Sequence, residues 1–467
     1  MHFSQRARQT LPLAALAGLL AACNGGGAGV SPGLPLANHQ TQQNARDSLE
    51  REPAPRGGAS SKIKHIIIIM QENRSFNNLF YGYKGARTAK YGYDSSGKRI
   101  KLLPIPLETT WDLEHDSYGD IAACNGTGSI PGTNCKNNGF NNEQAYCGSN
   151  CPIPHPQYAY VPQSETKPYF EMAQEWVLAD RMFASNFDAS SFISHQYIIS
   201  AQAEGAVNYP GGAWGCPGGP SDQIYTLGQQ RQILYSKPET VCWDPTTLGD
   251  ELDNAKVSWA FYGQFYSGNP WLWVAYQAIN HIYNGPDWGT DIMHSPSQIL
   301  TDVANGNLRS VSWVTPTWTN SDHAGSGSNT GPSWVTSVVN AIGQSQYWDS
   351  SAIFVFWDDY GGWYDPVPQP YADYDGLGMR LPLLVISPYA KQNYVSHVHY
   401  EHGSLLRFIE DTFGLGRLSK SDARAKSPAR DCFNFAQSPR SFVPIQAPYG
   451  RAFFLHQPPD NHVVDAE

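Results

Sequence analysis

The chain has 467 residues, enough for one large α/β domain or two ordinary domains and too many for a single small module. Hydrophobic residues make up 41% of the chain, which predicts a packed globular core and excludes a disordered protein. With 31 basic and 41 acidic residues the net charge is −10, which argues against a protein that binds nucleic acid through its phosphates. An anionic substrate would therefore need a local cation, and a metal ion is the obvious candidate.

The N-terminus carries the features of an export signal. Arg6 and Arg8 precede the apolar run 11–22, which is too short to cross a bilayer of about 30 Å as a helix. The run ends in Leu20-Ala21-Ala22-Cys23, which resembles the lipobox of bacterial lipoproteins. We expect 1–23 to be a lipoprotein signal and lipidated Cys23 to anchor the exported protein in the outer membrane or at the cell surface. An ordinary signal cut, leaving a periplasmic protein, is the alternative.

Residues 24–61 are rich in Gly, Pro, Ser, Gln and Asn and predict a flexible tether. Beyond Cys23, four of the seven remaining cysteines lie in the insert 119–156, at positions 124, 135, 147 and 151. Export to an oxidising compartment favours disulfides over a Cys₄ zinc site. The spacing also argues against zinc, because Cys124 and Cys135 lack the short separation of a zinc-binding pair. Cys216 and Cys242 form another plausible pair, which leaves Cys432 over, but spacing alone does not fix the connectivity.

Continuous apolar runs predict buried strands at 64–70, 351–357 and 381–386, with shorter candidates at 176–180 and 311–314. Helical patterns lie between them, at 191–203, 333–345 and 404–413. This alternation predicts an α/β fold with a largely parallel sheet, in a catalytic domain spanning 62–419. The Pro-rich segment 420–467 is expected to be an irregular C-terminal extension.

Acidic and amide side chains follow two of these strands. Glu72 and Asn73 come after the first, and Asp358 and Asp359 come after the second. Ligands of open α/β sheets sit beyond the carboxyl ends of the strands, where clustered carboxylates would repel one another unless a cation bridged them. Such oxygen ligands suit Mg²⁺, Ca²⁺, Mn²⁺ or Zn²⁺. Two unrelated loops with solvated acids are the alternative.

A serine pair begins the helix predicted at 191–203. Ser190 or Ser191 is either an ordinary N-cap or a nucleophile, because a helix N-terminus favours a phosphate and a bound metal lowers the pKa of a hydroxyl.

The segment 64–80, with Gln71-Glu72-Asn73-Arg74-Ser75-Phe76, resembles the opening motif of the bacterial phosphoesterase family. That family contains phospholipase C enzymes and acid phosphatases and is similar in fold to alkaline phosphatase. Further matches follow in the same order over 62–415, and they include 111–117, 180–203, 311–323 and 357–365. The resemblance implies a three-layer α/β sandwich with a largely parallel central sheet and long loop inserts.

The resemblance also implies roles for individual residues. The implied metal ligands are Glu72, Asn73, Asp358 and Asp359, the nucleophile is Ser191, and the histidines that contact the phosphoryl group are His115, His323 and, in a looser alignment, His281. His294 is a weaker alternative to His281. The chain departs from many relatives at Asn77, where they have Asp, and at Pro366, where they have a His after the acid that corresponds to Asp365. We interpret the local cluster of His397, His399 and His402 as structural.

The function implied is that of a metal-dependent phosphoric ester hydrolase with a serine nucleophile. We expect an acid-phosphatase-like phosphomonoesterase first and a phospholipase C second. A third hypothesis, favoured by Pro366, is a non-catalytic surface lipoprotein that binds a ligand on a phosphatase scaffold. The expected partners are a phosphate-ester substrate and, through Cys23, a membrane, with no nucleic acid.

Overall fold

The computed structural model describes residues 62–188, 190–265, 273–462 and 464–465. All of them belong to one compact unit, Pro53–Glu467. The predicted signal 1–23 with Cys23 and the predicted tether 24–61 lie outside the described residues. Within the described ranges, no helix has both the length and the apolar character needed to cross a bilayer.

The centre of this unit is a sheet of nine strands within the described residues. Its strand order is β11-β10-β12-β1-β13-β14-β6-β15, and β16 also pairs with β6. The strands are β1 (His65–Gln71), β6 (Val177–Phe183), β10 (Trp259–Tyr262), β11 (Ile292–Met293), β12 (Val311–Val314), β13 (Ser351–Trp357), β14 (Arg380–Ile386), β15 (Tyr394–Ser396) and β16 (Tyr400–Glu401). Only β14 runs antiparallel to its neighbours among these pairings, so the predicted α/β fold with a largely parallel sheet is confirmed.

The register of β1 and β13 places the site. Both strands are buried almost throughout, as continuous Ile and Phe runs require, and they pair in parallel from His65 with Ser351 to Gln71 with Trp357. Gln71 and Trp357, the last residues of the two strands, pair directly with each other. The residues that follow them, Glu72 and Asp358, therefore leave the sheet side by side at the same edge.

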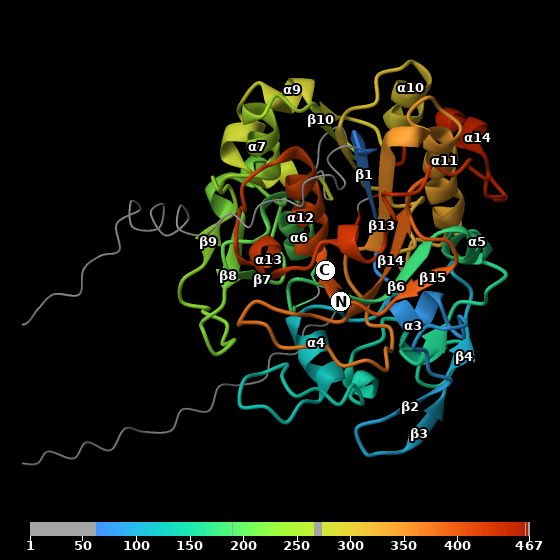
Figure 1. The fold of residues 1–467 in the computed structure, drawn as a ribbon. Helices are drawn as coiled ribbons and strands as arrows, with labels where there is room; N and C mark the ends of the chain where they lie inside the picture. The colour runs from blue at the N-terminus through green and yellow to red at the C-terminus, as the bar shows by residue number, and fades with distance from the viewer. Residues whose placement is uncertain (1–61, 189, 266–272, 463, 466–467) are drawn as a thin grey trace, which may run out of the picture. The chain divides into compact units, whose positions relative to one another are not determined.

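Helices cover both faces of the sheet (Figure 1). One group packs around α11 (Gly331–Gly343) and the other around α12 (His402–Phe413). The first group also contains α5 (Lys167–Glu175), α10 (Gln298–Ala304) and α14 (Arg451–His456). The second contains α6 (Ser191–Ser200), α7 (Leu248–Asn254) and α13 (Lys420–Arg424). The result is the predicted sandwich of three layers.

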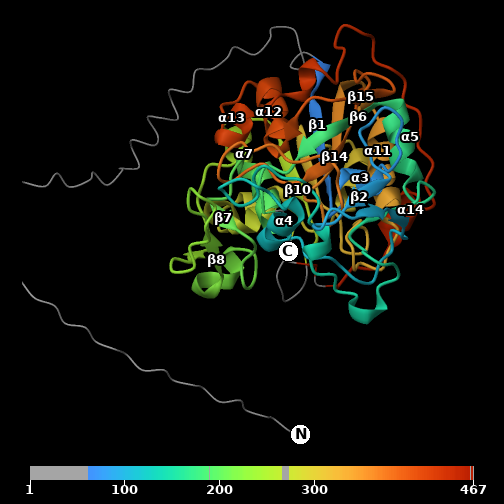
Figure 2. The same cartoon turned by 90° about the horizontal axis from the view of Figure 1, so that it is seen from below.

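Shorter elements surround this sandwich, and Figure 2 shows several of them from below. The short helices are α3 (Phe76–Leu79), α4 (Ser117–Cys124), α8 (Asn280–Tyr283) and α9 (Asp287–Thr290). The small sheets contain β2 (Tyr91–Tyr93) with β3 (Arg99–Lys101), β4 (Leu103–Pro104) with β5 (Ala159–Tyr160), and β7 (Ala206–Val207) with β8 (Gln223–Thr226) and β9 (Glu239–Thr240). In the described part of 420–467, α13, α14 and a short turn at Pro428–Arg430 are helical, and the rest is irregular.

The cysteines form disulfides rather than a zinc site. Cys124 pairs with Cys135, and Cys147 pairs with Cys151, both within the insert 119–156. Cys216 pairs with Cys242. Cys432 is a buried free thiol.

Candidate active site

The predicted ligands meet at the carboxyl edge of the sheet. Asn73 adopts a left-handed backbone conformation (φ 42°), and its backbone N–H donates to Asp358 Oδ1 at 3.3 Å. Its side-chain Nδ2 donates to Asp359 Oδ2 at 3.1 Å. Gly361 allows this close approach, because an added Cβ there would lie 2.2 Å from the Asn73 carbonyl oxygen.

Ser191 joins this cluster as the first residue of α6. Its Oγ lies 3.3 Å from both Glu72 Oε2 and Asp359 Oδ2, and it accepts a hydrogen bond from Asn73 Nδ2 at 3.3 Å. Ser190 is the N-cap residue, and its hydroxyl has no hydrogen-bond partner in the described part of the chain. The structure therefore directs Ser191, and not Ser190, into the acidic cluster.

Of the predicted histidines, His115 contacts Asn73, which also bonds Ser191, and His323 lies next to His115. His115 Nε2 lies 2.9 Å from Asn73 Nδ2, while its Nδ1 donates to the Leu113 carbonyl at 2.7 Å. The His323 ring lies 5.8 Å from the His115 ring, between centroids. His323 Nδ1 donates to the Ala324 carbonyl, and its buried Nε2 has no partner among the described residues. Within the described chain, His323 therefore keeps one unengaged ring nitrogen, on a ring next to that of His115.

The structure places His281 elsewhere. Its Nδ1 lies 2.5 Å from Asp244 and its Nε2 lies 2.9 Å from Asp250, on a ring that is 35% exposed. Both ring nitrogens are therefore engaged by aspartates outside the Ser191 cluster, and the expected contact with a phosphoryl group does not fit this position. The weaker alternative, His294, stacks on Phe265 with 3.9 Å between ring centroids.

Sequence reasoning missed His195. Its Nε2 lies 2.9 Å from Glu72 Oε1 and 4.0 Å from Asp358 Oδ2, and all three side chains are fully buried. Burial lowers the pKa of His195 to about 4. The available signal was its spacing of four residues from Ser191, which places both side chains on one face of a helix.

The cluster of His397, His399 and His402 divides into two environments. His397 contacts Asp180 at 2.8 Å, and His399 contacts Arg181 at 3.1 Å, as a structural role predicts. His402 is fully buried, accepts a hydrogen bond from the Ser185 backbone N–H at 3.4 Å, and has its pKa lowered to about 3 by burial.

The chemistry of the cluster fits a divalent cation. Burial, and then the charge of Asp358, raise the pKa of Glu72 and of Asp359 well above the usual carboxyl range. Asn73 Oδ1 and Asp358 Oδ2 are buried without a hydrogen-bond partner in the described residues, so they offer unused lone pairs. Within the described ranges, two groups have metal-ligand spacing: Glu72, His195 and Asp358, and beside it Asp112, His115 and His323.

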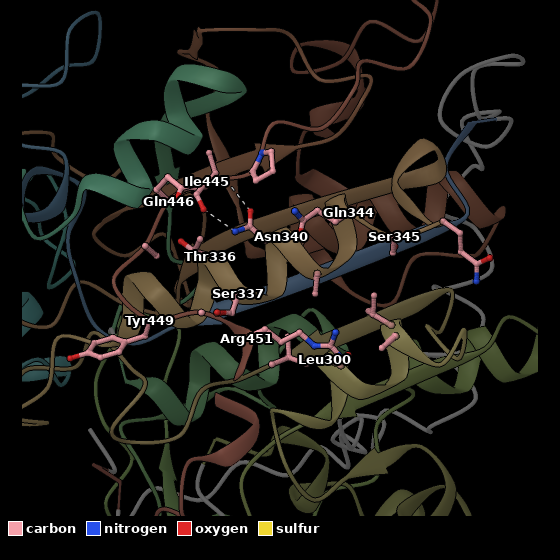
Figure 3. Close-up of a pocket in the computed structure, with 17 residues that line it drawn as sticks. Leu300, Thr336, Ser337, Asn340, Gln344, Ser345, Ile445, Gln446, Tyr449 and Arg451 are labelled. Carbon is pink, nitrogen blue, oxygen red and sulfur yellow. Dashed lines mark hydrogen bonds between the residues drawn. The ribbon is translucent and has the colours of Figure 1, made fainter. Parts of the chain in front are cut away.

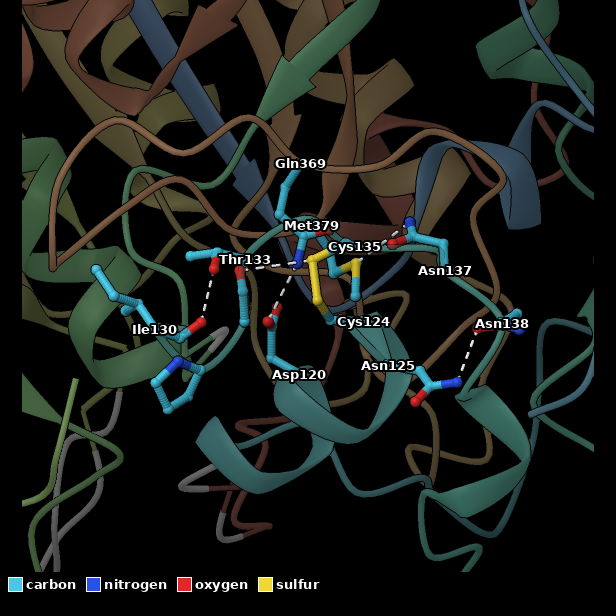
Figure 4. Close-up of a disulfide and its surroundings, with 12 residues drawn as sticks. Asp120, Cys124, Asn125, Ile130, Thr133, Cys135, Asn137, Asn138, Gln369 and Met379 are labelled. Atoms are coloured by element: carbon cyan, nitrogen blue, oxygen red, sulfur yellow. Dashed lines mark hydrogen bonds between the residues drawn. A yellow bond between two sulfur atoms is a disulfide. The ribbon is translucent and has the colours of Figure 1, made fainter. Parts of the chain in front are cut away.

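The departures from the family pattern have structural partners. The Asp365 carboxylate pairs with both Nε and Nη2 of Arg380 at 2.9 Å and accepts the Asn77 backbone N–H at 3.0 Å. Asn137 donates to the Asp365 and Val367 carbonyls on either side of Pro366, next to the Cys124–Cys135 disulfide (Figure 4). The ion pair between Asp365 and Arg380 thus holds the loop at 365–367, where Pro366 takes the position that a histidine has in many relatives.

A separate open cavity of about 800 Å³ lies between α10, α11 and the segment 444–451 (Figure 3). Asn340 bonds the backbone of Ile445 there, through both its Oδ1 and its Nδ2. None of the residues that line this cavity belongs to the Ser191 cluster.

The model of the Phosphoesterase family matches residues 63–416 of this chain. The chain is 24% identical to the hemolytic phospholipase C of Pseudomonas aeruginosa over 426 residues, which cover 79% of this chain and 55% of that protein. It is 25% identical to phospholipase C A of Mycobacterium tuberculosis over 450 residues, with 84% and 81% covered. It is 24% identical to non-specific phospholipase C1 of Arabidopsis thaliana, with 83% and 74% covered.

The chain spans little more than half the length of some curated relatives. It covers 55% of the Pseudomonas protein and 57% of another relative, the non-hemolytic phospholipase C of Burkholderia pseudomallei. Among solved structures, a protein of the alkaline phosphatase superfamily from Vibrio parahaemolyticus is similar, with a TM-score of 0.40 and 10% identity. That similarity covers 85% of this chain and 79% of the other.

Proposed function

Because the chain belongs to the Phosphoesterase family, we propose that it is a metal-dependent hydrolase of phosphoric ester bonds with Ser191 as its nucleophile. The observation that carries this proposal is the position of Ser191 Oγ, 3.3 Å from two carboxylates beside two unused ligand oxygens. A divalent cation held by Glu72, Asn73, Asp358 and Asp359 would lower the pKa of the serine hydroxyl and offset the charge of the phosphoryl group.

The residues of the chain then act in two steps. Ser191 Oγ forms a bond to phosphorus as the ester P–O bond breaks, its proton passes to an adjacent carboxylate, and the leaving alcohol takes up a proton. Water next attacks the phosphoserine, which releases phosphate, or the phosphorylated headgroup, and restores the hydroxyl. In this proposal His115 and His323 hold phosphoryl oxygens, and the N-terminus of α6 favours the negative charge.

Two substrate classes compete for this site. A phospholipid is the first candidate, because the relatives reported above are named phospholipases C. A small phosphomonoester, the substrate expected from the sequence, is the second. It is favoured by the full burial of Ser191, His115 and His323, because a small ester needs less displacement of the surrounding chain than a phospholipid does.

Ser191→Ala tests the nucleophile. We expect kcat to fall at least about 10³-fold while the protein still binds Mn²⁺, because the carboxylate ligands remain. Ser190→Ala is the matched control and keeps most activity, since its hydroxyl contacts none of the ligands. Full activity in Ser191→Ala would remove this residue from the nucleophile role.

Parallel assays separate the substrate classes. Release of phosphocholine from phosphatidylcholine supports the phospholipase, and turnover of a chromogenic phosphomonoester alone supports the phosphatase. Tight binding of either compound, without turnover in the presence of Mn²⁺ or Ca²⁺, would favour the binding scaffold instead.

The cellular location remains part of the proposal. We propose an exported lipoprotein, and the three disulfides support an oxidising compartment. Cys23→Ser tests the anchor. In cells fed labelled palmitate, the variant should carry no label and should no longer be recovered in the membrane fraction.

A further inference from the structure

His195 lies one helical turn after Ser191 on α6, so one helix presents both side chains to the same carboxylate. Glu72 lies between them: its Oε2 is 3.3 Å from Ser191 Oγ and its Oε1 is 2.9 Å from His195 Nε2. Each oxygen of Glu72 therefore has its own partner on α6.

The surroundings of His195 hold the ring in this orientation. The ring is fully buried and meets Trp214 edge-on, with 5.6 Å between centroids. The next carboxylate, Asp358, is farther away, with its Oδ2 at 4.0 Å. The contact of Nε2 with Glu72 Oε1 leaves Glu72 Oε2 directed toward the serine.

We propose that His195 is a positioning residue that fixes the Glu72 carboxylate for cation binding and sets it against Ser191. Glu72 follows directly from β1, whereas Ser191 and His195 belong to α6, so this contact also locks the helix to the sheet edge. The inference rests on the proposed metal site. Residues that orient metal ligands by hydrogen bonds commonly raise the metal affinity by roughly 10- to 100-fold.

The test uses Mn²⁺ titrations of the metal-free protein, followed by calorimetry, with three variants. His195→Gln keeps an N–H near the position of Nε2, and we expect its Mn²⁺ affinity to stay within about threefold of wild type. His195→Asn has the same amide on a shorter side chain that does not reach Glu72, and we expect about a tenfold loss or more. His65→Gln is the matched control: it makes the same change at the opposite end of β1, where the ring contacts the Arg309 carbonyl.

The outcomes separate this inference from the proposed function. If wild type binds no Mn²⁺, the metal site itself fails. If wild type binds and His195→Asn binds equally well, the positioning role is overturned. If His195→Gln loses as much affinity as His195→Asn while both keep the circular dichroism spectrum of wild type, the role is again overturned, because the imidazole would then be a ligand. Retention by Gln and loss by Asn is the expected result.

Discussion

At the scale of single residues, histidines of this chain differ according to the carboxylates around them. His281 is half-exposed between Asp244 and Asp250. Burial lowers its pKa, but hydrogen bonds and charge from the two aspartates outweigh burial, so the pKa is raised above its usual value. A raised histidine pKa stabilises the fold below the unfolded-state pKa, and this stabilisation is lost as pH rises through the folded-state pKa.

His281→Gln should therefore lower the free energy of unfolding at pH 5.5 by up to about 1 kcal/mol, because the ion pairs are screened by solvent, and by less at pH 9. Urea denaturation at both pH values measures this difference. In an Asp244→Asn, Asp250→Asn background, the pH dependence of the effect should disappear. The single His281→Gln variant should also keep its activity at pH 7. A large loss of kcat there would indicate that His281 is a catalytic residue.

The site residues show what a local pattern can predict. Glu72, Asn73, Asp358 and Asp359 each follow an apolar strand, and the rule that ligands gather at carboxyl ends is sufficient to bring them together. His195 carries no such mark, since a lone histidine within a helix is usually structural. Its importance comes from the three-dimensional placement of α6 over the end of β1, which the sequence does not encode locally.

At the scale of elements, β1, β13 and β14 were predictable because each contains a continuous apolar run, and almost every residue of the three strands is buried. The antiparallel direction of β14 was not predictable, because a strand buried on both faces has the same hydrophobic pattern whether it runs parallel or antiparallel to its neighbours. β10, β15 and β16 have only two to four residues each, too few to show a period. Helix α12 ends at Gly414 as expected, in a left-handed conformation (φ 74°) that glycine tolerates.

The insert 119–156 contains two of the three disulfides found within the described residues. Cys124–Cys135 closes a separation of 11 residues at the end of α4, beside Asn137 (Figure 4). Asn137 in turn donates to the carbonyls of Asp365 and Val367. Replacing both cysteines by Ala should cost about 2–4 kcal/mol in the free energy of unfolding, measured by guanidinium denaturation.

The second disulfide of the insert provides a matched control. Cys147–Cys151 closes a separation of only four residues near the exposed segment 148–150, so its removal should cost less. Equal losses from the two double variants would contradict a specific role for Cys124–Cys135 in supporting the loop.

At the scale of the whole molecule, we expect the buried acids to couple cation binding to stability. Glu72, Asp358 and Asp359 have no exposed area, and like charges so placed oppose folding. A ligand that binds the folded chain alone stabilises it by RT ln(1 + [L]/Kd), about 2.7 kcal/mol at 100 times Kd. We therefore expect EDTA to lower Tm by several degrees and added Mn²⁺ or Ca²⁺ to restore it.

Differential scanning calorimetry measures this shift. Asp358→Asn with Asp359→Asn should abolish the response to metal, and Ser191→Ala should keep most of it. A Tm that is unchanged by EDTA, in protein shown by elemental analysis to have lost its metal, would contradict the coupling.

The two halves of the proposed cation site are 285 residues apart along the chain, at Asn73 and Asp358, and the pairing of β1 with β13 brings them together. A ribosome makes the β1 segment long before the β13 segment. A chain cut short of β13 would therefore lack Asp358 and Asp359, and under the proposed mechanism its Ser191 would have no complete cation site to activate it.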